Sequence, residues 1–164
     1  MTTNARTDPT MERKLGQIQV GEKKITTVAF EAIKTEDQGG PGCSSSSYLC
    51  NRGPITFTTV RINLGQGFLD NGTFVAPSEG IYHFEVSLIA QQDAQLVMKT
   101  TRSNQMFRLY DRIYRGRYER TITKTATLKM EKGDGIYVEN ESSDTDSVWT
   151  DTMYPLTFKG FKIK

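Results

Sequence analysis

The chain is poor in the residues on which catalysis and metal binding most often depend. Its 164 residues include one histidine, His83, and two cysteines, Cys43 and Cys50. No constellation of side chains supplies an acid, a base and a nucleophile together, and no glycine-rich phosphate-binding loop is present. We therefore expect a protein that is not an enzyme and that requires no cofactor.

Long apolar segments and one-sided charge are absent as well. No apolar run approaches the length that crosses a bilayer, so the sequence predicts no membrane insertion. The 21 lysines and arginines nearly balance the 19 aspartates and glutamates, and the two signs are interspersed along the chain. Nucleic-acid binders usually concentrate positive charge in a patch or stripe, so we expect no nucleic-acid partner.

Helical patterns are nearly absent, whereas apolar residues recur at every second position in short runs from Ile25 onward. Clusters of Gly, Asn, Asp and Pro separate these runs, which is typical of a many-stranded antiparallel β-sandwich. The candidate strands begin at Ile25, Ile55, Thr73, Gly80, Ala94, Met106, Arg120, Gly135 and Leu156. The length fits one domain, which we place at residues 25–164. Residues 1–24 are expected to form a flexible leader or an expression remnant, because they are polar and lack the apolar segment of a secretory signal.

The last predicted strand has two apolar faces. Side chains alternate along a strand, so Phe158 and Phe161, three positions apart, lie on opposite faces. Gly160 removes a side chain between them, where another group can approach closely. A two-layer sandwich buries one face of each sheet, so the second apolar face predicts a neighbouring subunit. His83, in the middle of another strand, is expected on a sheet surface or at the axis of an assembly.

Two other strands show which side chains should cover the core. In the strand from Gly80 the inward residues are predicted to be Tyr82, Phe84, Val86 and Leu88. The strand from Arg120 carries a threonine at every second position, opposite its apolar residues; these are Thr121, Thr123, Thr125 and Thr127. This threonine row fits either a packed wall against a neighbour or a solvated strand face.

Cys43 and Cys50 lie in a stretch of Gly, Pro and Ser that forms no regular element. Six intervening residues allow the loop to double back, so a local disulfide is the first interpretation. Free thiols on an exposed loop are the alternative. A metal site is less favoured than either, because the single histidine is distant in sequence and no second cysteine pair exists.

The polar loop at residues 141–155 is the main candidate for ligand contact. It combines carboxylates suited to a hard cation with aromatic rings that can stack on a sugar. These residues are Asp144, Asp146, Trp149, Asp151 and Tyr154. Two interpretations stay open: calcium bound by the three aspartates, or a solvated turn whose acids maintain solubility, because an Asp-x-Asp pattern alone lacks the full set of calcium ligands.

Two further surface features carry chemistry. Arg112, Arg115 and Arg117 lie in a tyrosine-containing segment that can receive anionic sugars through charge-assisted bonds, or that forms an exposed basic hairpin. N-glycosylation sequons occur at Asn71 and Asn140, both in predicted turns. Such sites are used only in a eukaryotic secretory pathway, so they give modest support for secretion.

The block INLGQGFLDNGTFVAPSEGIYHFEVSL at residues 62–88 closely resembles the signature of the complement C1q globular head. Three shorter segments fall in the family's order: VAFEA around Phe30, LKMEKGDGIYVE around Gly133, and the closing TFKGFKI. Together they extend the resemblance from about Ile25 to the end of the chain. No collagen stalk is visible in the sequence, although members of the family often follow one.

The resemblance implies an all-β, ten-stranded antiparallel jelly roll of the type shared with the tumour necrosis factor superfamily. It also implies a compact homotrimer, an extracellular location, and recognition of a ligand without catalysis. The leading hypothesis is a secreted, lectin-like protein of innate immunity that binds glycans or charged ligands on cell surfaces. The alternatives are a cytokine-like or synaptic-organiser ligand for a cell-surface receptor, and a purely structural matrix, shell or fibre component.

Overall fold

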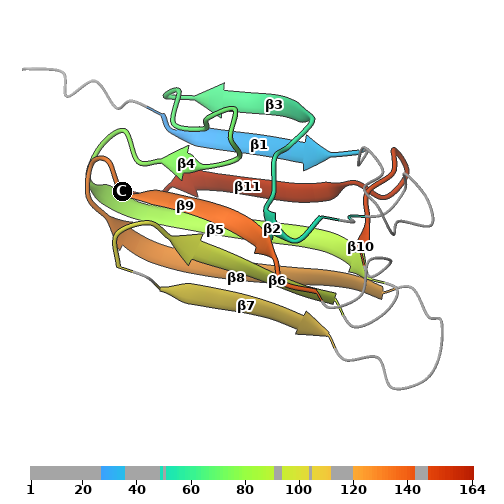
Figure 1. The fold of residues 1–164 in the computed structure, drawn as a ribbon. Coiled ribbons are helices and arrows are strands. Elements are labelled where there is room, and N and C mark those ends of the chain that lie inside the picture. Colours follow the sequence, from blue (N-terminus) through green and yellow to red (C-terminus); the bar gives the residue numbers. More distant parts are fainter. Residues whose placement is uncertain are drawn as a thin grey trace, which may run out of the picture.

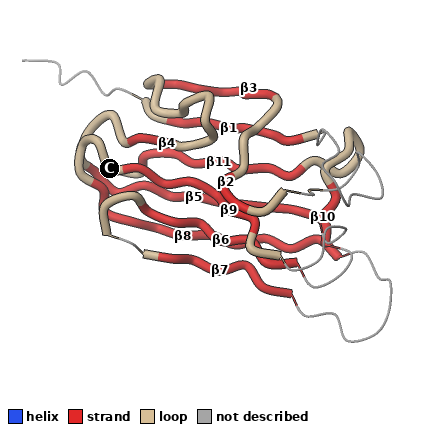
Figure 2. The backbone as a smooth tube through the Cα atoms, viewed as in Figure 1, coloured by secondary structure: helices blue, strands red, loops and turns tan. Residues whose placement is uncertain are grey.

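The computed structural model of the chain describes residues 27–35, 49, 51–90, 94–103, 105–111, 120–142 and 148–164. These residues form strands joined by loops and turns (Figures 1 and 2). None of them forms a helix long and apolar enough to cross a membrane. The all-β architecture predicted from the alternating pattern is therefore confirmed.

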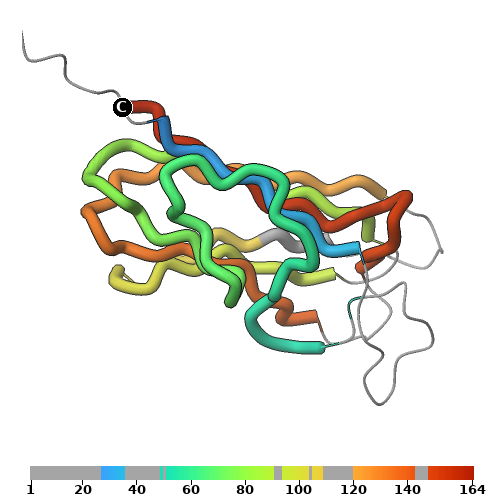
Figure 3. The backbone as a smooth tube through the Cα atoms, turned by 90° about the horizontal axis from the view of Figure 1, so that it is seen from above, coloured from blue at the N-terminus to red at the C-terminus, as the bar shows by residue number. Residues whose placement is uncertain are grey.

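The strands form two antiparallel sheets. The first sheet contains, in order, β8 (Arg120–Met130), β5 (Gly80–Ala90), β11 (Leu156–Lys162), β1 (Ala29–Lys34) and β3 (Thr59–Leu64), and the short β10 (Val148–Trp149) also pairs with β5. The second sheet contains β7 (Met106–Asp111), β6 (Ala94–Thr100) and β9 (Gly135–Asn140), and the short strands β2 (Gly53–Pro54) and β4 (Phe74–Val75) both pair with β9. The first and last strands, β1 and β11, run side by side (Figure 3).

A cluster of aromatic rings fills the space between the sheets. The Phe30 ring, from β1, lies 4.8 Å from the Phe68 ring, 4.9 Å from the Phe74 ring and 4.9 Å from the Phe158 ring, measured between centroids. The rings of Phe30 and Phe158 meet edge to face, an arrangement favoured by their quadrupoles. Because Phe74 comes from the second sheet and Phe158 from the first, these contacts join the two layers.

The inward side chains of β5 are those that alternation predicts. Tyr82, Phe84 and Val86 are fully buried, and Leu88 is 2% exposed. His83 points to the other face, as expected from its place between the inward-facing Tyr82 and Phe84. The register of β8 on β5 places the threonine row on that same outer face, opposite the buried Ala126 and Met130.

Strand β11 has the two faces that its sequence predicts. Phe158 is fully buried, whereas Phe161 is 49% exposed on the outer face of the first sheet. A Cβ atom at Gly160 would lie 2.6 Å from the Phe84 ring and 2.7 Å from the Phe30 ring. Only glycine leaves room for this packing, so the close approach expected at Gly160 is that of the protein's own core rings.

Two short strands were not predicted. β2 and β10 are each two residues long, too short to show the alternation by which a strand is detected in a sequence. The predicted strands that begin at Thr73, Gly80, Ala94, Met106, Arg120, Gly135 and Leu156 correspond to β4, β5, β6, β7, β8, β9 and β11. The strand predicted from Ile55 begins four residues later, as β3 at Thr59.

Replacing Phe158 with alanine is expected to lower the free energy of unfolding by about 3–5 kcal/mol, because a fully buried ring is lost and a cavity remains. Chemical denaturation monitored by circular dichroism measures this change. Met153→Ala is the control, since its side chain is 77% exposed and its removal should change stability by less than about 0.5 kcal/mol. Equal stability of the two variants would contradict the placement of Phe158 in the core.

Candidate binding surfaces

The outer face of the first sheet is a continuous surface built from five strands. Strand pairing aligns one row of side chains across it: Leu64 on β3, Ala29 on β1, Phe161 on β11, His83 on β5 and Thr127 on β8. The imidazole of His83 contacts the Phe161 ring at 5.4 Å between centroids, and its Nδ1 lies 3.0 Å from the Thr127 hydroxyl. The row is therefore apolar at one end and polar at the other.

Several polar groups on this outer face pair with one another. Lys159 on β11 forms an ion pair with Glu85 on β5, at 2.9 Å between Nζ and Oε1. The hydroxyls of Ser87 and Thr123 lie 3.0 Å apart. Small hydroxyl side chains and a neutralised ion pair suit packing against a second protein, whereas Glu31 on β1, beside Lys159, has no ion pair among the described residues.

Exposed apolar side chains are concentrated on the same face. Nine large apolar residues in the described part of the chain are at least 40% exposed, and Ile62, Leu64, Ile81 and Phe161 lie on the outer face of the first sheet. Apolar side chains gathered on one face in this way mark a site of protein association more often than a solvated surface.

The loop predicted to contact ligand is described in part. The Trp149 and Tyr154 rings lie 6.3 Å apart between centroids, at an angle of 63°. Asp151 Oδ1 accepts hydrogen bonds from the backbone N–H groups of Met153 and Tyr154, at 2.9 and 2.7 Å. The structure therefore brings three of the predicted ligand residues into one turn and shows that Asp151 shapes this turn.

Several predicted site residues lie outside the described part of the chain, and their predictions stand as they were made. They are Cys43, Cys50, Arg112, Arg115, Arg117, Asp144 and Asp146. Within the described ranges, no three His, Cys, Asp or Glu side chains gather closely enough to hold a metal ion. The calcium hypothesis, which needs two of these undescribed aspartates, stays a prediction.

The sequon at Asn140 requires a correction. The residue ends strand β9 instead of lying in a turn, and it is 2% exposed. Its Nδ2 donates hydrogen bonds to the carbonyl oxygens of Asn51, at 3.0 Å, and Leu49, at 3.4 Å, while its Oδ1 accepts one from the N–H of Ser142 at 3.0 Å. A glycan on this nitrogen is incompatible with that packing.

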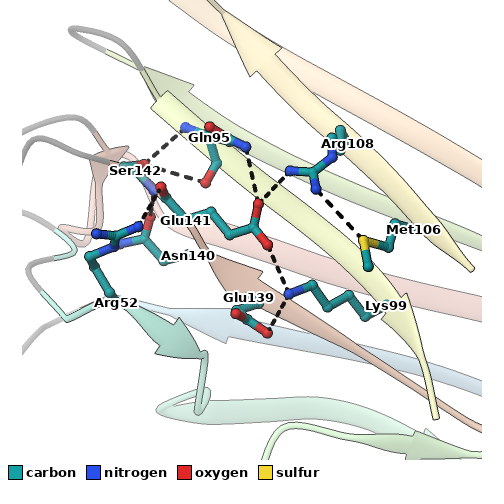
Figure 4. Close-up of polar contacts among 9 residues, drawn as sticks. All are labelled: Arg52, Gln95, Lys99, Met106, Arg108, Glu139, Asn140, Glu141 and Ser142. Atoms are coloured by element: carbon teal, nitrogen blue, oxygen red, sulfur yellow. Dashed lines mark hydrogen bonds and ion pairs between the residues drawn. The ribbon is translucent and has the colours of Figure 1, made fainter. Parts of the chain in front are cut away.

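A cluster of charged groups on the second sheet was not anticipated (Figure 4). Lys99 Nζ on β6 lies 2.9 Å from a carboxylate oxygen of Glu139, on β9, and 2.8 Å from one of Glu141, just after the end of β9. The other oxygen of Glu141 accepts hydrogen bonds from Arg108 on β7 and from Gln95 Nε2, the latter at 3.0 Å. The Glu141 carboxylate thus links the edge strand β7 to β6 and β9.

These contacts shift the pKa values of Glu141 and Lys99. The hydrogen bond from Lys99 holds the pKa of Glu141 below its ordinary value; Arg108 acts in the same direction, and partial burial opposes both. The hydrogen bonds to Glu141 and Glu139 raise the pKa of Lys99. Alternation along β6 and β9 indicates which charges face outward, but their pairing depends on strand register, which the sequence does not provide.

The sequence of the chain is similar to that of known proteins. A model of the C1q domain matches residues 22–163. Human and mouse complement C1q tumor necrosis factor-related protein 3 are each 31% identical to this chain over 87 residues, which are 51% of this chain. The match spans only about a third (35%) of the length of those relatives.

Two solved structures have a similar fold. The globular domain of the zebrafish complement 1qA protein superposes with a TM-score of 0.64 at 18% identity, covering 84% of this chain and 98% of that domain. The Eiger TNF structure from S. frugiperda superposes with a TM-score of 0.55 at 13% identity, covering 85% and 94%. At these identities the likeness concerns the fold alone, and it confirms the predicted jelly roll.

Replacing Glu141 with glutamine is expected to destabilise the protein by about 1 kcal/mol at neutral pH, because charge-assisted hydrogen bonds to strands β6 and β7 are weakened at a partly exposed site. Because the folded-state pKa of Glu141 is lowered, its contribution is complete above the unfolded pKa and is lost as the pH falls through the folded value. The difference between variant and parent should therefore be constant above about pH 5.5 and shrink towards zero below about pH 4.

Urea denaturation at several pH values measures this difference. Glu131→Gln serves as the control, because that carboxylate pairs with Arg102 at an exposed position and its loss should change stability by less than about 0.5 kcal/mol. A difference for Glu141→Gln that does not change between pH 7 and pH 3 would refute the role given to the carboxylate charge.

Proposed function

The chain belongs to the C1q domain family, and on that premise we propose that it is a secreted, non-enzymatic recognition protein that works as a homotrimer. Its subunits associate through the outer face of the first sheet. Its ligands are glycans or charged groups on cell surfaces, bound through loops at one end of the sandwich. This lectin-like activity serves pattern recognition in innate immunity.

The outer face of the first sheet carries the proposal of self-association. Phe161 is 49% exposed there and Leu64 52%, in a surface whose ion pair and hydroxyls are already satisfied. Covering these side chains removes apolar area from water, and the Lys159–Glu85 pair on this face is already neutralised. The threefold arrangement rests on family membership, because a flat face alone does not set the number of copies.

The turn at Trp149, Asp151 and Tyr154 supports ligand binding at one end of the molecule. Two aromatic rings are held close together, and the backbone between them is fixed by the Asp151 carboxylate. Aromatic faces on a rigid turn suit stacking against a sugar ring. In a trimer, three such turns would bind together, so that weak single-site affinity becomes strong avidity for a surface.

A receptor ligand is the second candidate. The curated relatives carry tumor necrosis factor in their name, and a TNF structure shares the fold, which favours a protein recognised by a cell-surface receptor. The two candidates differ in what they bind: a lectin binds immobilised glycans through the Trp149 turn, whereas a receptor ligand binds one purified ectodomain in a saturable manner.

Replacing Phe161 with glutamate is expected to reduce the mass in solution from three chains to one, because a charge would be buried in the contact between subunits. Multi-angle light scattering at several concentrations measures the mass. The melting behaviour of the resulting monomer should remain cooperative, because Phe161 contributes nothing to the core.

Met106→Glu is the matched control for this experiment. Met106 is 44% exposed, much like Phe161, but it lies on β7 of the second sheet, and its variant should keep the mass of the parent. A parent protein that is a monomer at every concentration would contradict the proposed assembly. If Met106→Glu dissociates the protein and Phe161→Glu does not, the contact between subunits lies on the second sheet and the proposal is wrong.

Replacing Trp149 with alanine is expected to lower the affinity of each site for a glycan by about fivefold, since stacking on an aromatic ring is worth about 1 kcal/mol. Where three sites bind one surface together, the loss should reach about a hundredfold. Binding is measured on a glycan array with the trimeric protein, with and without a calcium chelator. Trp149→Phe keeps a ring and should keep most of the affinity.

The chelator separates the two interpretations of the aspartates. Loss of binding on chelation supports calcium held by Asp144, Asp146 and Asp151, and unchanged binding supports a solvated turn. If the array shows no glycan bound by the parent, or equal binding by Trp149→Ala, the lectin proposal is wrong.

A further inference from the structure

The two sequons lie in opposite environments. Asn71 is exposed in a turn closed by two backbone hydrogen bonds between Leu69 and the residues Gly72 and Thr73. Its Oδ1 accepts a hydrogen bond from the N–H of Thr73 at 3.0 Å, and among the described residues nothing accepts a hydrogen bond from its Nδ2. The nitrogen that would carry a glycan is therefore free at Asn71, whereas at Asn140 it is buried and donates to two carbonyl oxygens.

The Asn71 turn is held in one conformation by its neighbours. Gly72 has a φ of +84°, and a Cβ atom at this position would collide with the carbonyl oxygen of Ile55. Gly72 therefore packs against the chain with its backbone, a close approach that any other residue would prevent. The neighbouring Asn71 side chain is exposed, so its orientation results from the fold of the turn.

From these contacts we infer that Asn71 is an N-glycosylation site and that Asn140 is unmodified in the folded protein. The co-reactant is an oligosaccharide carried on a lipid pyrophosphate. A bond forms between Asn71 Nδ2 and C1 of the first sugar, the bond from C1 to the pyrophosphate oxygen breaks, and the amide nitrogen loses one proton. The inference rests on the secretory location in the proposed function, because the modification takes place in that pathway.

The glycan would leave the assembly surface open. The segment that contains Asn71 joins the second sheet, since Phe74 and Val75 pair with Ile136 and Gly135 of β9. At the tip of the turn, Gly72 packs on Ile55. The N–H of Ile55 donates a hydrogen bond to the carbonyl oxygen of Val138, which is also in β9. Asn71 therefore belongs to the layer opposite the outer face of the first sheet, and a sugar chain there would hydrate the outside of a trimer.

The experiment directs the full chain into the secretory pathway of a eukaryotic cell line with an added signal peptide. Secreted protein is purified by size exclusion, and its mass is measured before and after treatment with peptide N-glycosidase F, which converts a glycosylated asparagine to aspartate. We expect one glycan per chain, with conversion at Asn71 and none at Asn140 in the peptide map.

Two variants of the sequon provide matched controls. Thr73→Ala leaves Asn71 in place but destroys the sequon, so the glycan should be lost completely, whereas Thr73→Ser keeps the sequon and should keep the glycan. Secretion of the folded parent without a glycan, or a glycan on Asn140 in the folded fraction, would overturn the inference.

Light scattering of the same samples distinguishes this failure from failure of the proposed function. Glycosylated and deglycosylated protein should contain the same number of chains. A glycosylated monomer would contradict the trimer and leave Asn71 as the acceptor. A trimer that forms only after removal of the glycan would overturn the placement of Asn71 away from the assembly surface.

Discussion

The packing of the Phe30 ring over strand β11 is the constraint on which the rest of the structure depends. Phe30 pairs with Gly160 across β1 and β11, and its ring fills the space that a side chain at position 160 would need. The same ring contacts Phe158, which is fully buried. These contacts fix the register of β11, because a slip of one residue would turn Phe158 outward and Lys159 inward. Once the register is fixed, Phe161 must face away from the core.

The packing of Phe30 against Gly160 determines which side chains face the core and which form the outer surface of the first sheet. The outer face of the first sheet collects apolar side chains beside paired polar groups, which suits contact with other subunits. The second sheet presents the Lys99–Glu141–Arg108 cluster and the layer to which the Asn71 turn belongs, both compatible with water. The Trp149 turn lies at one end of the first sheet, where β10 pairs with the end of β5. In the function we propose, assembly and hydration use opposite faces of the sandwich, and recognition uses one end of it.

The sequence predicted those features that depend on alternation along a single strand. The buried row of β5 and the opposite faces of Phe158 and Phe161 follow from a period of two and need no knowledge of neighbouring strands. Features that depend on pairing between strands were missed. The contacts of Glu141 with Lys99 and Arg108 join three strands, and β2 and β10 are too short to show a period. Asn140 was predicted to lie in a turn, whereas its amide completes the end of β9.

In the assembly we propose, Phe161 is covered by another copy of the chain, and fluorine NMR can detect this contact. With 4-fluorophenylalanine at position 161, the resonance shifts between H2O and D2O only when the ring contacts solvent. We expect little solvent shift at high protein concentration, as for a fluorinated Phe158, and a full shift after dilution to the monomer. A full solvent shift at every concentration would contradict the proposed assembly.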